Sequence, residues 1–458
     1  MRQSSILDAR GKPKRKRRWF RFSLKTFLLV LAVFGVWLGL LVHRANNQQE
    51  AVQWVEDQGG TVSYDFEWHE EGRRVYNPQP PGPDWLRDLI GIDYFADVVE
   101  VHLDHAQVSD LSPLAKLTSL KWLHLFYTEI SDIEPLRELT KLQELDLRGT
   151  QITDLAPLRE LTQLQVLTLS ETQDSDLEPL RELTKLQELH LGSTQVSDLG
   201  PLRQLTQLHM LNLFNTPVSD LEALRELTKL QTLHLNITQL SDISPLRELT
   251  QLQWLALDGT QVSDLEPLRQ LTELGSLALD GTQVSDLQPL RKLTQLFYLG
   301  LNGTQVSDLE PLRELTQLQD LYLSGTQVSA LEPLCELTQL QWLVLIGTPV
   351  TDLEPLRELT QLEFLDLSGT SVSDLTPLAK LTSLESLNLT NTPVSDLTPL
   401  AKLAGLESLN LTNTPVSDLT PLAKLTGLET LDLSYMPVSL DQIKMLQQAL
   451  PKCNIQQD

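Results

Sequence analysis

Leucine recurs at fixed places in a 22-residue repeat, L-x-x-L-x-L-x-x-T-x-V-S-D-L-x-P-L-x-x-L-T-x, over most of the chain. Repeats begin at Leu120 and then every 22 residues as far as Leu428, without insertion or deletion, and a degenerate first copy begins at Val98. This makes about 16 repeats. A fixed period of this length predicts a solenoid, in which each repeat buries its apolar residues against its neighbours.

The pattern within one repeat predicts a short strand followed by a turn and a helical segment. Positions are counted here from the leading leucine. Leucine at positions 4 and 6 points inward, so positions 3, 5 and 7 project from the other face of the strand. Aspartate at position 13 is expected to cap the helical segment, and proline at position 16 lies in its first turn, where a missing N–H costs nothing.

The repeat resembles the 22-residue leucine-rich repeats of bacterial internalins and of a eukaryotic phosphatase-regulatory subunit, over residues 98–439. The resemblance implies an α/β solenoid with a horseshoe shape, with a parallel sheet on the concave face and short 3-10 or helical turns on the convex face. Threonine replaces the family's asparagine at position 9 in 14 consecutive repeats, Thr128 to Thr414. Threonine has one donor where an amide has two, so we expect a weakened hydrogen-bond ladder. Asp174 replaces an aliphatic residue, so its turn is expected to be marginal or open.

A basic segment and an apolar stretch precede the repeats. Residues 1–25 contain ten Lys and Arg against one acid, and Phe27 to Val42 is uninterrupted apolar sequence. Sixteen residues give about 24 Å of helix, which is close to the thickness of a bilayer core. We predict one transmembrane helix at 26–43. A cleavable signal peptide is the alternative, but residues 40–46 contain no small-x-small pair. By the positive-inside rule, the N-terminus is cytoplasmic and the rest lies outside the cytoplasm.

The resulting organisation has five parts. They are a basic cytoplasmic segment (1–25), the transmembrane helix (26–43), a juxtamembrane region and N-terminal cap (44–97), the repeats (98–439) and a C-terminal cap helix (440–458). Within the cap region, residues 46–58 are expected to form a separate amphipathic helix that Gly59 and Gly60 end.

Acidic residues dominate the net charge of −25. Aspartate occupies position 13 in 14 repeats from Asp110 to Asp418, with Ala330 as the exception. A calcium-binding array is one interpretation, but the chain has no Asp-x-Asp-x-Asp-Gly loop. We favour capping, with Arg at position 18 and Glu at position 19 forming ion pairs between repeats.

Histidine occupies position 5 in four repeats, at His102, His124, His190 and His234. His102 and His124 lie on neighbouring strands, and with Asp104 or Asp146 they could hold zinc. Position 5 is exposed to solvent and tolerates histidine, so we predict no metal site and no cofactor. The chain also lacks the Gly-x-Ser-x-Gly, His-Glu-x-x-His and phosphate-loop motifs. We therefore predict that it is not an enzyme.

Aromatic residues at positions 3, 5 and 7 are the best candidates for a binding site. Five lie in six consecutive repeats, and two lie near the start of the array: Trp254, Tyr298, Tyr322, Trp342 and Phe364, then Trp122 and Phe126. These positions do not face the core, so exposure there favours binding of a protein partner. The alternative is aromatic packing across strands that stabilises the sheet.

The charges on the same face narrow the choice of ligand. Positions 3, 5 and 7 carry many acids, among them Asp258, Asp280 and Asp320, against the single Arg148. Such a surface repels phosphate, so we predict no nucleic-acid partner. The sequence thus predicts a membrane-anchored protein that binds another protein outside the cytoplasm through its concave face. The alternatives are a structural envelope spacer without a specific ligand, a cell-wall glycan binder and a cytoplasmic scaffold.

Overall fold

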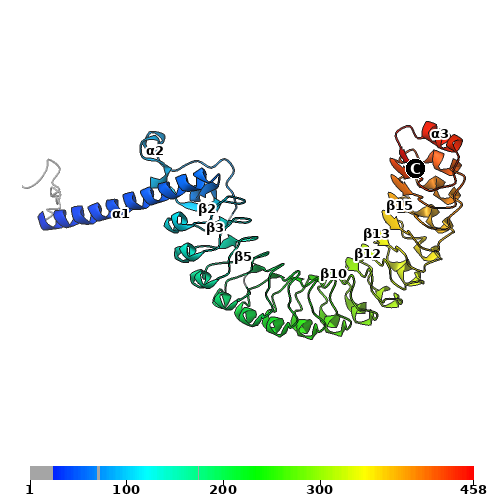
Figure 1. Ribbon diagram of the computed structural model, residues 1–458, viewed down its shortest axis with the longest axis horizontal. Coiled ribbons are helices and arrows are strands. Elements are labelled where there is room, and N and C mark those ends of the chain that lie inside the picture. Colours follow the sequence, from blue (N-terminus) through cyan, green and yellow to red (C-terminus); the bar gives the residue numbers. More distant parts are fainter. Residues whose placement is uncertain (1–23, 70–72, 174, 458) are drawn as a thin grey trace, which may run out of the picture. The chain divides into compact units, whose positions relative to one another are not determined.

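The computed structural model describes residues 24–69, 73–173 and 175–457 (Figure 1). The basic segment as far as residue 23, and Asp174, lie outside the described residues. The chain forms two bodies. The smaller body comprises residues up to Gln53 together with Tyr64–Val98, and the larger comprises Trp54–Ser63 and everything from Val99 onward.

The larger body is built on one parallel sheet, to which each repeat contributes one strand. Equal positions of neighbouring repeats face each other, as Leu277 faces Leu299. The strands of the repeats are β2 (Val98–His102), β3 (Trp122–His124), β4 (Glu144–Asp146), β5 (Val166–Thr168), β6 (Glu188–His190), β7 (Met210–Asn212), β8 (Thr232–His234), β9 (Trp254–Ala256), β10 (Ser276–Ala278), β11 (Tyr298–Gly300), β12 (Asp320–Tyr322), β13 (Trp342–Val344), β14 (Phe364–Asp366), β15 (Ser386–Asn388), β16 (Ser408–Asn410) and β17 (Thr430–Asp432). In Figure 1 these strands follow the inner side of a curved array. The predicted solenoid with a parallel sheet is confirmed.

Two further strands extend the sheet to 18 strands. β1 (Thr61–Tyr64) pairs with β2, and β18 (Asn454–Gln456) pairs with β17. Between β17 and β18 lies the helix α3 (Leu440–Ala449), whose first turn is capped where Ser439 Oγ accepts a hydrogen bond from the Gln442 amide. The predicted cap helix over 440–458 was too long: α3 ends at Ala449, because Pro451 disfavours the helical conformation in the residue before it, and Asn454–Gln456 form a strand instead.

The core of the larger body consists of the conserved apolar columns of the repeat. In the repeat that begins at Leu274, the residues at positions 1, 4, 6, 11, 14, 17 and 20 are at most 1% exposed: Leu274, Leu277, Leu279, Val284, Leu287, Leu290 and Leu293. Burying one such side chain stabilises the fold by roughly 1.5–3 kcal/mol. Because every repeat supplies the same set, the core runs the length of the array.

Threonine at position 9 is buried and bonds within its own repeat. Thr282 Oγ1 donates to the carbonyl of Leu279 at 2.7 Å, and the same bond recurs from Thr128 to Thr414. The expected bond from threonine to neighbouring backbone is present. The single hydroxyl donor reaches the carbonyl three residues before it and closes the turn of one repeat.

The outer turns of the repeats are short 3-10 helices. They are η3 (Ser112–Lys116), η4 (Glu134–Glu138), η5 (Ala156–Glu160), η6 (Glu178–Leu180), η7 (Gly200–Gln204), η8 (Glu222–Glu226), η9 (Ser244–Glu248), η10 (Glu266–Gln270), η11 (Gln288–Lys292), η12 (Glu310–Leu312), η13 (Glu332–Glu336), η14 (Glu354–Leu356), η15 (Thr376–Lys380), η16 (Thr398–Lys402) and η17 (Thr420–Lys424). In η4, Asp132 Oδ1 accepts a hydrogen bond from the amide of Glu134 at 2.8 Å. The other position-13 aspartates make the same bond, which confirms capping as their role.

The ion pairs on these turns differ from the expectation. Arg137 pairs with Glu134, three residues before it in the same turn, and five further repeats carry the equivalent pair. We had expected position 18 to pair with position 19 of another repeat. Arg291 does so, pairing with Glu314 at 2.7 Å, and its own repeat has Gln288 in place of the glutamate at position 15. Wherever a repeat has both glutamate at position 15 and arginine at position 18, the arginine pairs with that glutamate.

A single long helix, α1 (Leu24–Asp57), runs through the region where we predicted two helices. Residues 43–46, His-Arg-Ala-Asn, contain no glycine or proline that would end a helix, so the apolar stretch continues into the amphipathic one. The predicted C-terminal stop is confirmed: α1 ends just before Gly59, which has a φ of 81°. Among the described residues, α1 is the one helix long and apolar enough to cross a membrane, a criterion that a signal sequence also meets.

The smaller body also contains the elements between α1 and the repeats. These are η1 (Asp65–Glu67), α2 (Asp84–Ile90) and η2 (Ile92–Tyr94). Gln48 of α1 is buried, and its amide nitrogen donates both to Asp93 Oδ1 and to the carbonyl of Ala96, each at 2.9 Å. Its amide oxygen accepts from the backbone of Val98. One buried side chain thus ties α1 to the segment that leads into the first repeat.

Candidate binding surface on the concave sheet

Side chains at positions 3, 5 and 7 of each repeat form one continuous surface, which we call the concave face. In β3, Leu123 is fully buried while Trp122 and His124 on either side of it are half-buried. Eight other repeat strands alternate in the same way, and the remaining seven, such as β9 and β13, also bury at least one residue beside the central one. The prediction that positions 3, 5 and 7 project away from the core is confirmed.

Five aromatic residues on the concave face form the aromatic strip, defined as Trp254, Tyr298, Tyr322, Trp342 and Phe364. Position 3 of strands β11 to β14 brings Tyr298, Asp320, Trp342 and Phe364 into consecutive register. Trp254 is separated from Tyr298 by Ser276 alone. The regular register therefore places residues that are 20 to 110 positions apart in the sequence on one surface.

The rings of the strip pack across neighbouring strands, and part of their surface remains exposed to solvent. The rings of Trp342 and Phe364 stack with centroids 4.0 Å apart and planes 5° apart, and those of Tyr298 and Tyr322 lie 5.4 Å apart at 42°. Aromatic packing across strands is thus present. It leaves Trp254 and Trp342 43% and 37% exposed, however, so the packing does not account for all of the aromatic surface.

Trp122 and Phe126 form a separate group in the second repeat. The Lys121 ammonium lies 5.5 Å from the centre of the Trp122 ring. Phe126 meets the ring of His105 edge-on at 5.0 Å, and both aromatic residues are half-buried. The structure does not bring this pair to the aromatic strip, which begins six repeats later.

Acidic and amide side chains at position 7 line the strip and are held by the backbone. Asp258 Oδ1 accepts from the amide of Asp280 at 2.9 Å, Asp280 accepts from that of Asn302 at 2.7 Å, and Asn302 accepts from that of Ser324 at 2.8 Å. Each side chain thus reaches one repeat forward. We predicted from these acids only a negative surface, although their recurrence at a single position is a signal for this ladder.

Burial changes the ionisation of groups in this region. It raises the pKa of Asp258, and the neighbouring Asp280 charge raises it further, while burial alone raises the pKa of Asp320. Burial, followed by the charge of Asp280, raises the pKa of Tyr298 to about 12. Tyr298 is therefore a neutral hydrogen-bond donor at physiological pH, beside carboxylates that can accept.

The histidines at position 5 fall into two kinds. His102 and His124 stack on adjacent strands with ring centroids 4.3 Å apart. The nearest carboxylate is Glu100, not Asp104 or Asp146 as expected: His102 Nε2 lies 2.9 Å from Glu100 Oε1. His190 and His234 lie on non-adjacent strands, β6 and β8, and burial lowers the pKa of each.

Two exposed apolar residues lie beside the strip, and only one of them could be predicted from the sequence. Phe297 at position 2 is 39% exposed, and Ile346 at position 7 is 40% exposed. Ile346 follows from the alternation of the strand. Phe297 was missed because position 2 lies outside the alternating set and is polar in most repeats.

The repeats are similar to a known repeat family and to several solved structures. The family model described as leucine-rich repeats (2 copies) matches residues 140–182, 184–226, 206–248 and 360–402. No curated protein sequence matches the chain significantly. A leucine-rich repeat protein from Leptospira interrogans is 25% identical with a TM-score of 0.73, over 78% of this chain and 94% of that one. The functional domain of InlJ from Listeria monocytogenes, at 22% identity and a TM-score of 0.64 over 74% of each chain, shares the fold.

The internalin inlF from Listeria monocytogenes gives the highest sequence identity among these structures. It is 33% identical with a TM-score of 0.63, and the match covers 64% of this chain and 87% of the internalin. Identity at this level over most of a solved internalin goes beyond a shared fold. The chain belongs to the bacterial internalin-like leucine-rich repeat proteins.

Proposed function

We propose that this protein is anchored in a membrane by α1 and binds a protein partner outside the cytoplasm through the aromatic strip. The observation that carries the proposal is the exposure of Trp254 and Trp342 on the concave face, at 43% and 37%. Large aromatic side chains left exposed in a group are typical of interaction surfaces. Tryptophan and tyrosine are also the residues that contribute most to binding energy when a partner buries them.

The surroundings of the strip favour a partner with apolar and basic side chains. Asp320 lies on β12, and Asp258 and Asp280 follow β9 and β10 at position 7, where backbone hydrogen bonds hold them in place. Arginine matches such a surface because its guanidinium pairs with carboxylates and stacks on aromatic rings. Phosphate-rich ligands are disfavoured by the same charges.

The proposal is tested by photo-crosslinking in the cells that make the protein. A photoreactive phenylalanine analogue replaces Trp342 in one variant and Ser408 in a control variant, since Ser408 occupies the same position 3 of β16 in a stretch of small polar residues. The proposal expects a discrete crosslinked protein from position 342 and none from position 408. Equal crosslinking from both positions, or none from position 342, contradicts it.

A glycan ligand would use the same aromatic rings, because sugars stack on tryptophan and tyrosine. It is distinguished by titrating the full chain with cell-wall fragments while tryptophan fluorescence is recorded. A saturable change that the paired replacement of Trp254 and Trp342 by Phe abolishes would identify a glycan binder in place of a protein binder. A structural spacer predicts neither crosslinking nor a fluorescence change.

The anchoring part of the proposal rests on α1, whose apolar side chains are exposed to the surroundings, with Leu29 at 65%. The lysine- and arginine-rich start of the chain supports a cytoplasmic N-terminus. Protease added to intact cells is expected to degrade the repeats, whereas a cytoplasmic scaffold would be degraded only after permeabilisation. The size of the protein retained in the membrane tells an uncleaved anchor from a signal peptide.

A further inference from the structure

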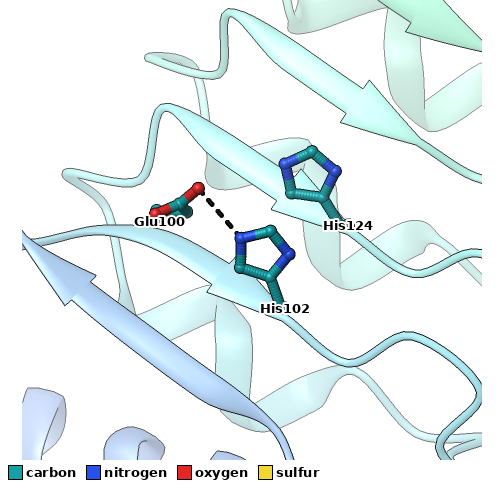
Figure 2. A group of neighbouring side chains, drawn as sticks. All are labelled: Glu100, His102 and His124. Atoms are coloured by element: carbon teal, nitrogen blue, oxygen red, sulfur yellow. Dashed lines mark hydrogen bonds and ion pairs between the residues drawn. The ribbon is translucent and has the colours of Figure 1, made fainter. Parts of the chain in front are cut away.

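Three metal-binding side chains converge on the concave face in the first two repeats. Glu100 and His102 are positions 3 and 5 of β2, so the strand pleat places both on one side. His124 is position 5 of β3, directly opposite His102 in the parallel register. Figure 2 shows the carboxylate of Glu100 directed at the His102 ring, with the His124 ring beside it.

The distances suit a shared ion. His102 Nε2 and Glu100 Oε1 are 2.9 Å apart, and one ligand atom from each of the three residues lies within 4.8 Å of the others. Two ligands at zinc–ligand distances of about 2.0–2.2 Å in tetrahedral geometry are about 3.3 Å from each other. The ligand atoms are therefore close enough to share one ion once a histidine ring reorients.

Residues around the three ligands also favour metal binding. His102 Nδ1, the nitrogen that faces away from Glu100, lies 3.4 Å from Asp104 Oδ2. A carboxylate at the second nitrogen fixes the orientation and tautomer of a metal-bound histidine. Glu100 is only 5% exposed, so its carboxylate is held in a fixed position beside the two rings.

We propose that Glu100, His102 and His124 bind a divalent transition metal ion of the zinc class. Two imidazoles and one carboxylate suit zinc, cobalt or nickel better than calcium or magnesium, which prefer oxygen ligands. Three protein ligands leave a fourth position open toward the concave face, where water or a side chain of a partner can bind. The two rings lie nearly parallel, 5° apart, so binding requires one of them to rotate out of the stack.

This proposal is independent of the aromatic strip. The three ligands lie in the first two repeats, whereas the strip lies in the eighth to thirteenth. Loss of either site leaves the other intact. We predicted no metal here because position 5 is exposed to solvent and tolerates histidine, and the carboxylates considered beside the two histidines were Asp104 and Asp146, not Glu100.

Cobalt is the probe for the test, because tetrahedral cobalt with nitrogen ligands absorbs visible light. The full chain, purified in detergent with a tag that contains no histidine, is titrated with cobalt and then with zinc. We expect about one equivalent to bind with tetrahedral d–d absorption, and zinc to displace the cobalt. Glu100→Gln and His124→Gln should each abolish this absorption, and Asp104→Asn should weaken binding about 10–100-fold.

His234→Gln is the matched control, because His234 also occupies position 5 but faces Asn212 and Ala256 on the neighbouring strands. It should leave binding unchanged. Absence of saturable binding to the parent chain, or equal loss in His234→Gln and His124→Gln, overturns the proposal. X-ray absorption of the zinc-loaded parent chain needs no variant: two imidazoles in the first shell support the site, and a shell of oxygen alone overturns it.

Discussion

At the residue scale, position 8 of every repeat has a left-handed backbone. All 16 residues there have positive φ, and seven of them are glycine. Ile237 is the least suited of the others, because a β-branched side chain at a φ of 58° crowds its own backbone. The repeat imposes this conformation whatever residue it carries, so some repeats store backbone strain.

Replacing Ile237 by glycine should therefore stabilise the protein. The left-handed conformation costs an ordinary residue roughly 1–2 kcal/mol, and the greater flexibility of glycine in the unfolded chain offsets about 0.5–1 kcal/mol of that. We expect a net gain of about 0.5–1 kcal/mol in urea unfolding. Gly281→Ala, at the same position with a φ of 69°, should lose a similar amount. A loss in Ile237→Gly would mean that the 54% exposed side chain makes contacts worth more than the strain.

Asp258 should make the stability of the protein depend on pH. Burial, together with the nearby charge of Asp280, raises its pKa in the folded state above that in the unfolded chain. The folded state therefore binds the proton more tightly, and stability is lost as pH rises through the folded pKa. Asp258→Asn should be more stable than the parent at pH 7, and the difference should shrink toward acidic pH. A difference that stays constant with pH contradicts this account.

Single residues were predicted well where they belong to a column of the repeat. The roles of Leu277 in the core and of Asp132 in capping follow from periodicity alone. The partner of His102 did not, because Glu100 lies in a first repeat that has valine in place of leucine at positions 1 and 4, and its burial comes from the folded chain. Contacts that differ from one repeat to the next depend on side-chain reach, which the pattern does not encode.

At the element scale, one hydrogen bond begins every outer 3-10 turn except η13. The amide of the residue at position 15 donates to the aspartate two residues before it, and η13 lacks this bond because Ala330 replaces the aspartate. The turn still forms in η13, since its leucines Leu331 and Leu334 are buried as elsewhere. Packing thus determines the turn, and the aspartate adds stability.

Ala330→Asp should supply the missing cap to the Glu332 amide. Capping side chains contribute about 0.5–2 kcal/mol, so we expect a gain in the free energy of unfolding near the lower end of that range. Asp308→Ala, which removes the same bond from η12, should lose a comparable amount. Ala330→Asn tests whether the hydrogen bond or the charge is responsible, since it can cap without adding charge. Equal stability of all three variants and the parent would show that the caps contribute nothing.

The prediction of elements succeeded within the periodic region and failed outside it. Strands and turns follow from leucine spacing, which repeats identically. The predicted length of α1 was wrong. The sequence changes from apolar to amphipathic at residues 43–46, but no residue there ends a helix. β18 was missed because its pairing with β17 depends on α3 returning the chain to the sheet edge.

At the scale of the whole molecule, the repeats divide into a constant scaffold and a variable surface. Leucine, threonine, aspartate and proline columns build the array, and several of the acids on the concave face hold its backbone. The aromatic strip belongs to neither group. Among the described residues, replacing Trp254 and Trp342 breaks none of the hydrogen bonds that recur from repeat to repeat. That separation makes binding testable without unfolding the protein.

The most direct test of the account is the affinity of the full chain for the protein that crosslinks at position 342. Trp342→Ala combined with Tyr322→Ala is compared with Ser386→Ala combined with Ser408→Ala, a pair from the polar stretch of the same face. Each buried aromatic contributes about 2 kcal/mol or more, which is about 30-fold in affinity, so the aromatic pair should weaken binding by roughly 700-fold if the two contributions add. The serine pair should leave the affinity unchanged. Equal affinity of both double variants, with unchanged unfolding midpoints, would contradict the central claim.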